Sequence, residues 1–252
     1  MDRLAAIQSI RAALGAGKHT VGSWIQIPHP SVAEIMGQSG YDWVAIDMEH
    51  GSIGVEQLPD LCRALELGGT LPLVRVARGH FKDCKQALDA GAGGIIAPMI
   101  ESAEQLAEVR DACRWPPAGR RGVGFSRANL FGRNFDDYRL EAQAPLLVAM
   151  IEHQRAVENL AAIAAVEGLD ALLVGPYDLS SSIGRTAEFQ HAEFEALMAR
   201  ILDGARAAGV ACGIHVVTPA PQELQRRLSA GYRFIAYGID SVILHQGARR
   251  PQ

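Results

Sequence analysis

The sequence predicts a single α/β domain spanning residues 1–252, folded as a (β/α)₈ TIM barrel, and three observations support this. Eight short apolar runs alternate with longer amphipathic segments along the 252 residues. The runs are almost continuously apolar, which is typical of parallel strands covered on both faces. The length is close to the roughly 250 residues that such a barrel needs. An open doubly wound sheet is the alternative, because strand order cannot be derived from one sequence.

The expected strands are short and rich in Val, Ile, Leu and Ala. In chain order they are Val21–Ile27, Trp43–Asp47, Pro72–Val76, Gly94–Met99, Leu146–Ile151, Ala171–Val174, Ala211–Val217 and Phe234–Gly238. Segments with helical spacing of apolar residues separate them. The expected helices are Ser31–Ser39, Val55–Leu67, Phe81–Ala90, Ser102–Cys113, Val157–Val166, Ala192–Ala208 and Pro221–Ala230. The alternation of the two kinds of segment predicts βα units throughout.

One stretch, Arg114–Pro145, interrupts this alternation. It is much longer than an ordinary connection and combines Gly, Pro, aromatic residues and several Arg without a clear period. Long irregular segments in compact domains are usually functional. We therefore expect this segment to control substrate access or to form a subunit contact.

Composition excludes several classes of protein. With 24 basic and 28 acidic residues, a net charge of −4 and no basic run, the chain is not expected to bind nucleic acid. No apolar stretch approaches the roughly 18 residues of a membrane helix, and Met1–Leu14 has helical spacing interrupted by charges, unlike a signal peptide. The four cysteines form no CxxC pair, so buried free thiols in a cytoplasmic protein are expected.

Charged side chains stand where several of the predicted strands end. Asp47 and His50 follow the second strand, Arg75 lies near the end of the third, and Glu152 and Asp178 follow the fifth and sixth. Barrel enzymes carry their catalytic residues at these ends. Because the last two strands are neighbours, both carboxylates can converge on one divalent ion, Mg²⁺ or Mn²⁺ in preference to Co²⁺ or Zn²⁺. The alternative is that both are ordinary acids at helix starts.

Other strand-end residues complete the predicted site. His50 is the candidate general base, oriented by a hydrogen bond from its ring to Asp47, and Arg75 would stabilise an oxyanion. Each could instead be structural, His50 as a capping or core histidine and Arg75 in an ion pair with Asp47 or Glu49. A turn at Gly175-Pro176 could present the backbone N–H groups of Tyr177 and Asp178 to a substrate carboxylate. His215, within the seventh predicted strand, would line the pocket.

Other chemistries lack their motifs. The chain has no P-loop lysine, no full dinucleotide-binding glycine pattern and no G-x-S-x-G elbow. It also lacks a strand-end lysine suited to Schiff-base formation.

Several motifs, in order and suitably spaced, resemble the HpcH/HpaI aldolase family over about residues 22–244. They include DWVAIDMEHG, PLVRV, ALDAGAGGIIAPM, WPPAGRRGVG, VAMIE and VEGLDALLVGPYDLSSSIG. The resemblance implies a metal-dependent, class II aldolase on a (β/α)₈ barrel of the pyruvate/phosphoenolpyruvate type. It also implies a homo-oligomer, usually a hexamer, in which a helix is exchanged between subunits.

The resemblance assigns roles to individual residues. It implies that Glu152 and Asp178 bind the metal, that His50 with Asp47 transfers a proton, and that Arg75 stabilises an enolate oxygen. Asp89 matches a family aspartate near the site and a subunit contact, and Arg127 matches an arginine near the pocket.

Two residues depart from the family pattern. Met150 stands where the family commonly has Gln, and His215 stands where it commonly has an apolar residue. Both departures leave the residues expected to form the enolate in place and bear on which aldehyde the enzyme accepts.

The sequence therefore predicts a carbon–carbon lyase that cleaves a 4-hydroxy-2-oxo acid into pyruvate, or a similar 2-oxo acid, and an aldehyde. Its expected partners are these small molecules, with neither nucleic acid nor a membrane. Two alternatives stay open: an oxaloacetate-type decarboxylase on the same site, and a non-catalytic barrel that binds a metabolite.

Overall fold

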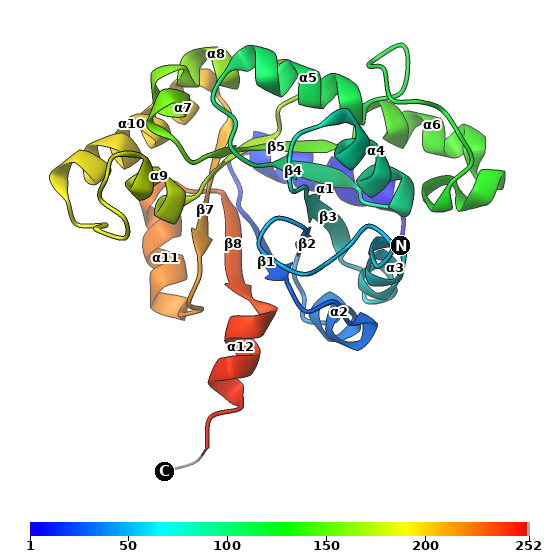
Figure 1. Ribbon diagram of the computed structural model, residues 1–252, viewed down its shortest axis with the longest axis horizontal. Helices are drawn as coiled ribbons and strands as arrows, with labels where there is room; N and C mark the ends of the chain where they lie inside the picture. Colours follow the sequence, from blue (N-terminus) through cyan, green and yellow to red (C-terminus); the bar gives the residue numbers. More distant parts are fainter. Residues whose placement is uncertain (251–252) are drawn as a thin grey trace.

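A computed structural model describes residues 1–250, in which eight parallel strands close into a barrel in chain order (Figure 1). This confirms the predicted fold; residues 251–252 of the predicted domain lie outside the described part. The strands are β1 (Thr20–Ile25), β2 (Trp43–Asp47), β3 (Leu71–Arg75), β4 (Gly94–Ala97), β5 (Leu146–Ile151), β6 (Ala171–Val174), β7 (Ala211–Val216) and β8 (Phe234–Ile239). Each differs from its predicted range by at most a few residues at either end.

Helices surround the barrel, as the alternating pattern predicts (Figure 1). They are α1 (Arg3–Gly15), α2 (Pro30–Gly37), α3 (Leu58–Leu67), α4 (Phe81–Ala90), α5 (Ala103–Cys113), α6 (Phe135–Gln143), α7 (Gln154–Glu158), α8 (Leu160–Ala164), α9 (Pro176–Ser182), α10 (Ala192–Ala208), α11 (Pro221–Ala230) and α12 (Asp240–Gly247), with a 3₁₀ segment η1 (Arg127–Gly132). Helix α1 packs Ile7 and Ile10 into the same cluster as the interior barrel residues.

Two apolar layers form the core because each strand is buried on both faces. One layer fills the barrel, where Trp43 stacks on Phe234 with ring centroids 4.2 Å apart. Gly22 is required beside them, since a Cβ there would lie 2.1 Å from the Trp43 ring. The second layer lies between strands and helices and holds the buried Cys62, Cys84 and Cys212.

The segment Arg114–Pro145 is less irregular than predicted, because η1 and α6 lie within it. Tyr138 and Ala142 of α6 pack with Trp115 and Ala128 in a small separate cluster. The prediction missed α6 because few of its residues are apolar, so its helical period is weak. The predicted helix Val157–Val166 is also replaced, by α7 and α8, which meet at Asn159.

Helix α12 projects away from the barrel (Figure 1), and Asp240 is its only buried residue. The Asp240 carboxylate accepts hydrogen bonds from the backbone N–H groups of Gln26 and Ile27, both at 2.9 Å, which joins the start of α12 to the end of β1. Beyond Asp240, the partly buried Ile243 packs against the core, whereas Leu244 and His245 are exposed.

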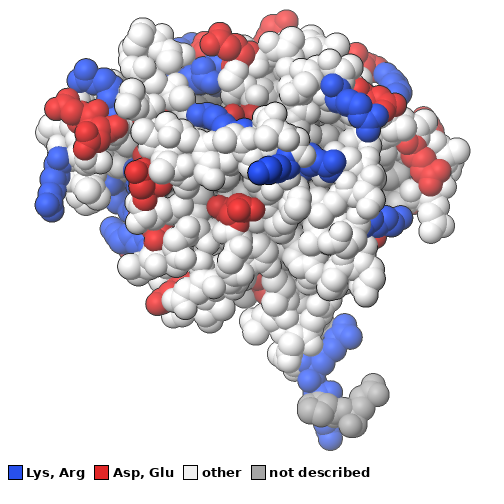
Figure 2. All heavy atoms as spheres, turned by 180° about the vertical axis from the view of Figure 1, so that it is seen from behind, with Lys and Arg blue, Asp and Glu red and all other residues white. Residues whose placement is uncertain are grey.

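Charge and hydropathy of the surface agree with the composition. Figure 2 shows Lys and Arg side chains scattered among Asp and Glu over one face, without a continuous basic patch there. Within residues 1–250, none of the helices combines the length and apolar character needed to cross a membrane. The cysteines in this part of the chain are free and buried, as predicted.

Candidate active site at the carboxyl ends of the strands

Asp47 and Arg75 form a buried, two-pronged ion pair at the ends of β2 and β3, where the register sets them opposite each other. Arg75 Nε donates to Asp47 Oδ1 at 2.9 Å and Nη2 donates to Oδ2 at 2.7 Å. Gln26 Nε2 also donates to Oδ2, at 2.9 Å. Burial acts to raise the pKa of Asp47, but its bonds to Arg75 outweigh burial and hold the pKa below its usual value. The pair therefore stays charged and rigid.

The same carboxylate shapes the turn after β2. Asp47 Oδ1 accepts the backbone N–H groups of Glu49 at 3.0 Å and His50 at 3.2 Å. The predicted hydrogen bond from the His50 ring to Asp47 is therefore corrected: Asp47 accepts from the His50 main chain. The His50 side chain is 54% exposed, and its Nε2 lies 3.8 Å from Glu49 Oε2. His50 thus stands at the mouth of the site beside a different carboxylate.

Glu49, which the sequence suggested only as a possible ion-pair partner of Arg75, is a further residue of the site. Its Oε2 is buried with no hydrogen-bond partner in the described part of the chain, 3.4 Å from Arg75 Nη1. Burial raises the pKa of Glu49 to about 7; Arg75 opposes this shift, and the charges of Asp47 and Asp178 add to it. Its place between the two predicted residues Asp47 and His50 was the available signal.

Glu152 follows β5 directly and is 2% exposed. Its Oε2 accepts the backbone N–H of Met99 at 2.9 Å, and Met99 has a left-handed conformation with φ of 51°. Gly175 allows the close approach, since a Cβ there would lie 2.4 Å from Glu152 Oε1. Burial, together with the charges of Glu49 and Asp178, raises the pKa of Glu152 to about 7.

Asp178 lies in the first turn of α9, directly after β6. Its charge acts on both Glu49 and Glu152, so carboxylates from three strand ends face one region. Buried like charges are costly unless a cation balances them. Within residues 1–250 no three His, Cys, Asp or Glu side chains are arranged as a complete metal site. The residues present fit a divalent ion held by two carboxylates, with substrate and water as the other ligands.

The raised pKa of Glu152 predicts how stability depends on pH in metal-free protein. Between its usual value of 4.5 and about 7, folded Glu152 keeps a proton that the unfolded chain has released. The free energy of unfolding should therefore fall as pH rises through this window. The comparison is Glu152→Gln, whose side chain can still accept the Met99 N–H. Over this window the free energy of unfolding of the wild type should fall by up to about 3 kcal/mol more than that of Glu152→Gln. Denaturant unfolding in chelator from pH 5 to 8 measures this; parallel curves for the two proteins would contradict it.

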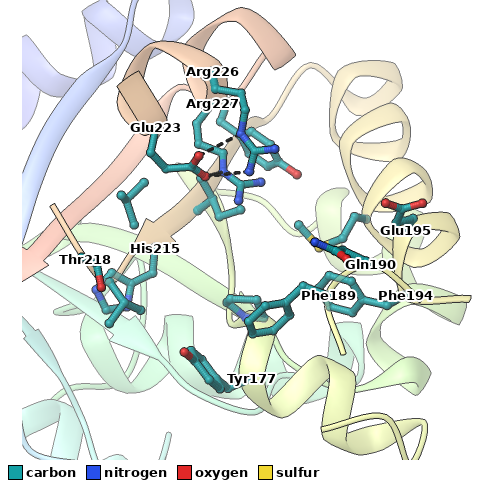
Figure 3. Close-up of a pocket in the computed structure, with 16 residues that line it drawn as sticks. Tyr177, Phe189, Gln190, Phe194, Glu195, His215, Thr218, Glu223, Arg226 and Arg227 are labelled. Carbon is teal, nitrogen blue, oxygen red and sulfur yellow. Dashed lines mark hydrogen bonds and ion pairs between the residues drawn. The ribbon is translucent and has the colours of Figure 1, made fainter. Parts of the chain in front are cut away.

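Three predicted substrate-binding residues lie together at a cavity of about 630 Å³ (Figure 3). Pro176 and Tyr177 come from the start of α9, and His215 comes from β7. Tyr177 packs edge-on against Phe189, with centroids 5.1 Å apart. The cavity therefore begins beside Asp178 and extends between α10 and α11.

Two predicted residues, Arg127 and Asp89, are not brought to this cluster. Arg127 Nη2 is ion-paired with Glu66 Oε2 at 2.6 Å, and its Nη1 donates to the Ala90 carbonyl at 3.2 Å. Asp89 is ion-paired with Lys85. Glu66 and Asp89 lie near the carboxyl ends of α3 and α4, and such helix ends are at the opposite rim from the carboxyl ends of the strands. Within its own chain Arg127 is therefore held away from the carboxylates at the strand ends, and its expected place near a pocket stays a prediction.

A buried arginine and clustered carboxylates at the carboxyl ends of barrel strands define a (β/α)₈ enzyme. The model of the HpcH/HpaI aldolase/citrate lyase family matches residues 20–246, and the chain belongs to this family. The chain is thus a lyase of the aldolase type.

Individual relatives match over nearly the whole chain. A hydroxypyruvate/pyruvate aldolase of Roseobacter denitrificans is 38% identical, covering 95% of this chain and 94% of its own. A 4-hydroxy-2-oxovalerate aldolase of Novosphingobium aromaticivorans is 39% identical, covering 96% and 92%. The crystal structure of an HpcH/HpaI aldolase/citrate lyase family protein from Burkholderia cenocepacia superposes with a TM-score of 0.89 at 34% identity, covering 96% of each chain.

Proposed function

We propose that this protein is a class II, metal-dependent aldehyde-lyase. It reversibly cleaves a 4-hydroxy-2-oxo acid into pyruvate, or a similar 2-oxo acid, and an aldehyde. The observation that carries the proposal is the group of carboxylates of Glu49, Glu152 and Asp178 beside Arg75. The names of the relatives, which include pyruvate and 4-hydroxy-2-oxovalerate aldolases, support the substrate class.

Glu152 and Asp178 would hold the metal, Mg²⁺ or Mn²⁺, because these ions prefer oxygen ligands. The unpartnered Glu49 Oε2, found among the described residues, fits a site that a cation and its water complete. When bound, the metal supplies Lewis-acid polarisation of the 2-oxo acid. The chain's own residues then determine how the substrate is oriented and where the proton moves.

Arg75 stabilises the negative charge that develops on the keto oxygen of the 2-oxo acid. Two of its nitrogens are fixed by Asp47, while Nη1 has only a long contact with Met150 Sδ, at 3.8 Å, besides the 3.4 Å contact with Glu49. Nη1 is therefore the donor available to substrate, held in place before substrate binds. Asp47 acts as a positioning residue, since its contacts are with Arg75 and with the turn that carries Glu49 and His50.

His50 moves the proton at its Nε2, the atom near Glu49. The backbone N–H groups of Tyr177 and Asp178 stand in the first turn of α9, where a helix offers donors without internal partners. They would hold the substrate carboxylate. Gly175 serves the same region by leaving room for Glu152.

We also propose that the protein assembles with further copies of itself and exchanges α12. This helix leaves its own barrel with one buried residue. Large apolar side chains are exposed near Asp89 and Arg127, where Phe131 lines a surface pocket and is 70% exposed. Asp89 would act at such a subunit contact, and not in the site of its own chain.

Metal removal tests the proposed function. Wild-type protein loaded with Mg²⁺ or Mn²⁺ should exchange the methyl protons of pyruvate in D₂O, and chelator treatment should abolish the exchange until metal is restored. Proton NMR measures the rate. A screen of aldols and oxo acids then distinguishes the chemistry: decarboxylation of an oxaloacetate-like acid without aldol cleavage would identify a decarboxylase. Substrate binding without exchange would identify a non-catalytic barrel.

A further inference from the structure

Polar atoms without partners lie in the barrel beside Arg75. Trp24 of β1 carries the Arg75 guanidinium over its ring, with Cζ 4.4 Å from the ring centroid, and the Trp24 and His215 ring centroids are 5.7 Å apart. Both Trp24 Nε1 and His215 Nε2 are shielded from solvent and have no hydrogen-bond partner in residues 1–250. Leaving a buried polar atom unpaired costs about 1–3 kcal/mol, so such atoms at a site indicate a missing partner.

The protonation state of the His215 ring determines which kind of group can be the missing hydrogen-bond partner. Burial lowers the pKa of His215 to about 4, a hydrogen bond to the Gly238 carbonyl partly opposes this, and the Arg75 charge adds to it. The imidazole is therefore neutral at physiological pH. Since Nε2 is the unpartnered nitrogen, the bond to Gly238 uses Nδ1–H. A neutral imidazole with its proton on Nδ1 has a lone pair on Nε2, which accepts hydrogen bonds and cannot donate them.

A cavity borders this part of the chain, and His215 is one of its lining residues. Figure 3 shows His215 and Thr218 at one end, with Tyr177 nearby and the ion-paired Glu223, Arg226 and Arg227 on another wall. Pro176 and Tyr177 belong to both the cavity and the segment that carries Asp178. Its volume of about 630 Å³ is within the usual range of small-molecule sites. The segment that carries Asp178 and the strand that carries His215 therefore border the same cavity.

We propose that His215 is a specificity-determining residue that accepts a hydrogen bond from a hydroxyl group of the substrate, next to the carbon atoms that react. This inference rests on the proposed aldolase function and names its substrate class: hydroxylated 2-oxo acids or hydroxylated aldehydes. A hydroxyl can donate to Nε2 and can also accept from the neighbouring Trp24 N–H. A methyl group leaves both atoms unpaired, and a carboxylate cannot donate to Nε2.

We expect strong discrimination between substrates with and without the hydroxyl group, because Trp24 Nε1 and His215 Nε2 are buried without hydrogen-bond partners among residues 1–250. A site that hydrogen-bonds a substrate hydroxyl strongly rejects the analogue without that hydroxyl. An apolar pocket rejects a substrate with an additional hydroxyl much less strongly. We expect kcat/KM for the hydroxylated compound to exceed that for its isosteric deoxy analogue by on the order of 10- to 100-fold. The hydroxyl can reside on either reactant, and matched pairs distinguish the two sources.

The experiment uses two isosteric pairs with metal-loaded protein. The acceptor pair is glycolaldehyde against propanal, each with pyruvate; the donor pair is hydroxypyruvate against 2-oxobutanoate, each with one shared aldehyde. The variants are His215→Leu, which removes the acceptor atom, and His215→Asn, whose amide oxygen can replace it. The matched control is His19→Leu, an exposed histidine outside the site.

The wild type should prefer the hydroxylated member of at least one pair. His215→Leu should abolish that preference, His215→Asn should retain part of it, and His19→Leu should retain it fully. Equal rates for both members of both pairs in the wild type would overturn the inference. So would a His215→Leu enzyme in which all four rates fall by one factor, because that result indicates a structural role.

Failure of the proposed function can be distinguished from failure of the His215 inference. If metal-loaded wild type does not exchange the pyruvate methyl protons, the aldolase proposal and this inference fall together. If exchange occurs but the hydroxyl preference is absent or independent of position 215, only the His215 inference is refuted.

Discussion

Glu152→Ala is expected to lower metal-dependent proton exchange of pyruvate by at least about 100-fold, because a Lewis acid contributes several kcal/mol to such chemistry. Glu152 is 2% exposed and is oriented by the Met99 N–H, so no solvent-exposed group can take its place. Removing it also leaves Asp178 as the one remaining carboxylate of the proposed ligand pair. Exchange rates measured over a range of Mn²⁺ concentrations give the effect on both affinity and turnover.

The control for this variant is Glu158→Ala, an exposed glutamate on α7 a few residues further along the chain. It should leave exchange and Mn²⁺ affinity unchanged. Wild-type exchange by Glu152→Ala at saturating metal would show that Glu152 is not a metal ligand. Weaker Mn²⁺ binding in the same variant, measured by calorimetry, would be expected in any case if the assignment is right.

Two replacements of Arg75 test its roles in catalysis and in stability: Arg75→Lys should mainly lower kcat, and Arg75→Leu should also lower the free energy of unfolding. Arg75→Lys keeps the charge but cannot reproduce the two-pronged bond to Asp47, so kcat should fall by on the order of 100-fold while Mn²⁺ affinity is largely kept. Arg75→Leu leaves Asp47 buried without its partner and should lower the free energy of unfolding by about 3–5 kcal/mol. Steady-state kinetics and denaturant unfolding measure the two effects.

Arg155→Lys provides the comparison, because Arg155 is a largely exposed residue paired with Glu101. Surface ion pairs contribute little, so both its stability and its kcat should stay near the wild-type values. If Arg75→Lys had wild-type kcat, Arg75 would serve only to hold Asp47, and another donor would have to stabilise the developing charge.

Much of the fold was predictable from the chain because the governing signals are local. Continuous apolar runs such as Leu146–Ile151 and Ala171–Val174 predict strands buried on both faces, and both have the predicted bounds in the structure. Helix α6 escaped prediction because its few apolar residues give only a weak helical period. Asn159 separates α7 from α8, a break that the apolar pattern alone does not show.

The site was predictable in part. Glu152, Asp178 and Arg75 were expected together because they follow strands, and carboxyl ends of parallel strands share one rim. Glu49 was expected only as a possible ion-pair partner of Arg75 because, on sequence alone, the acid next to a histidine is as consistent with a solvated turn as with a buried site. Arg127 was placed at the pocket by resemblance, whereas its guanidinium pairs with Glu66 at the opposite rim.

The alternation of strands and helices, and the strand ends that carry Asp47, Arg75, Glu152 and Asp178, can be derived from the chain alone, whereas closure of the barrel is a property of the folded protein. Periodicity and strand boundaries are properties of neighbouring residues, so they can be derived without the fold. That Asp47 bonds to Arg75 and not to the His50 ring could be established only in the folded protein. The same is true of the buried atoms of Glu49 and His215 that have no partners in residues 1–250. Those outcomes depend on strand register, side-chain direction and burial, which arise when distant segments pack together.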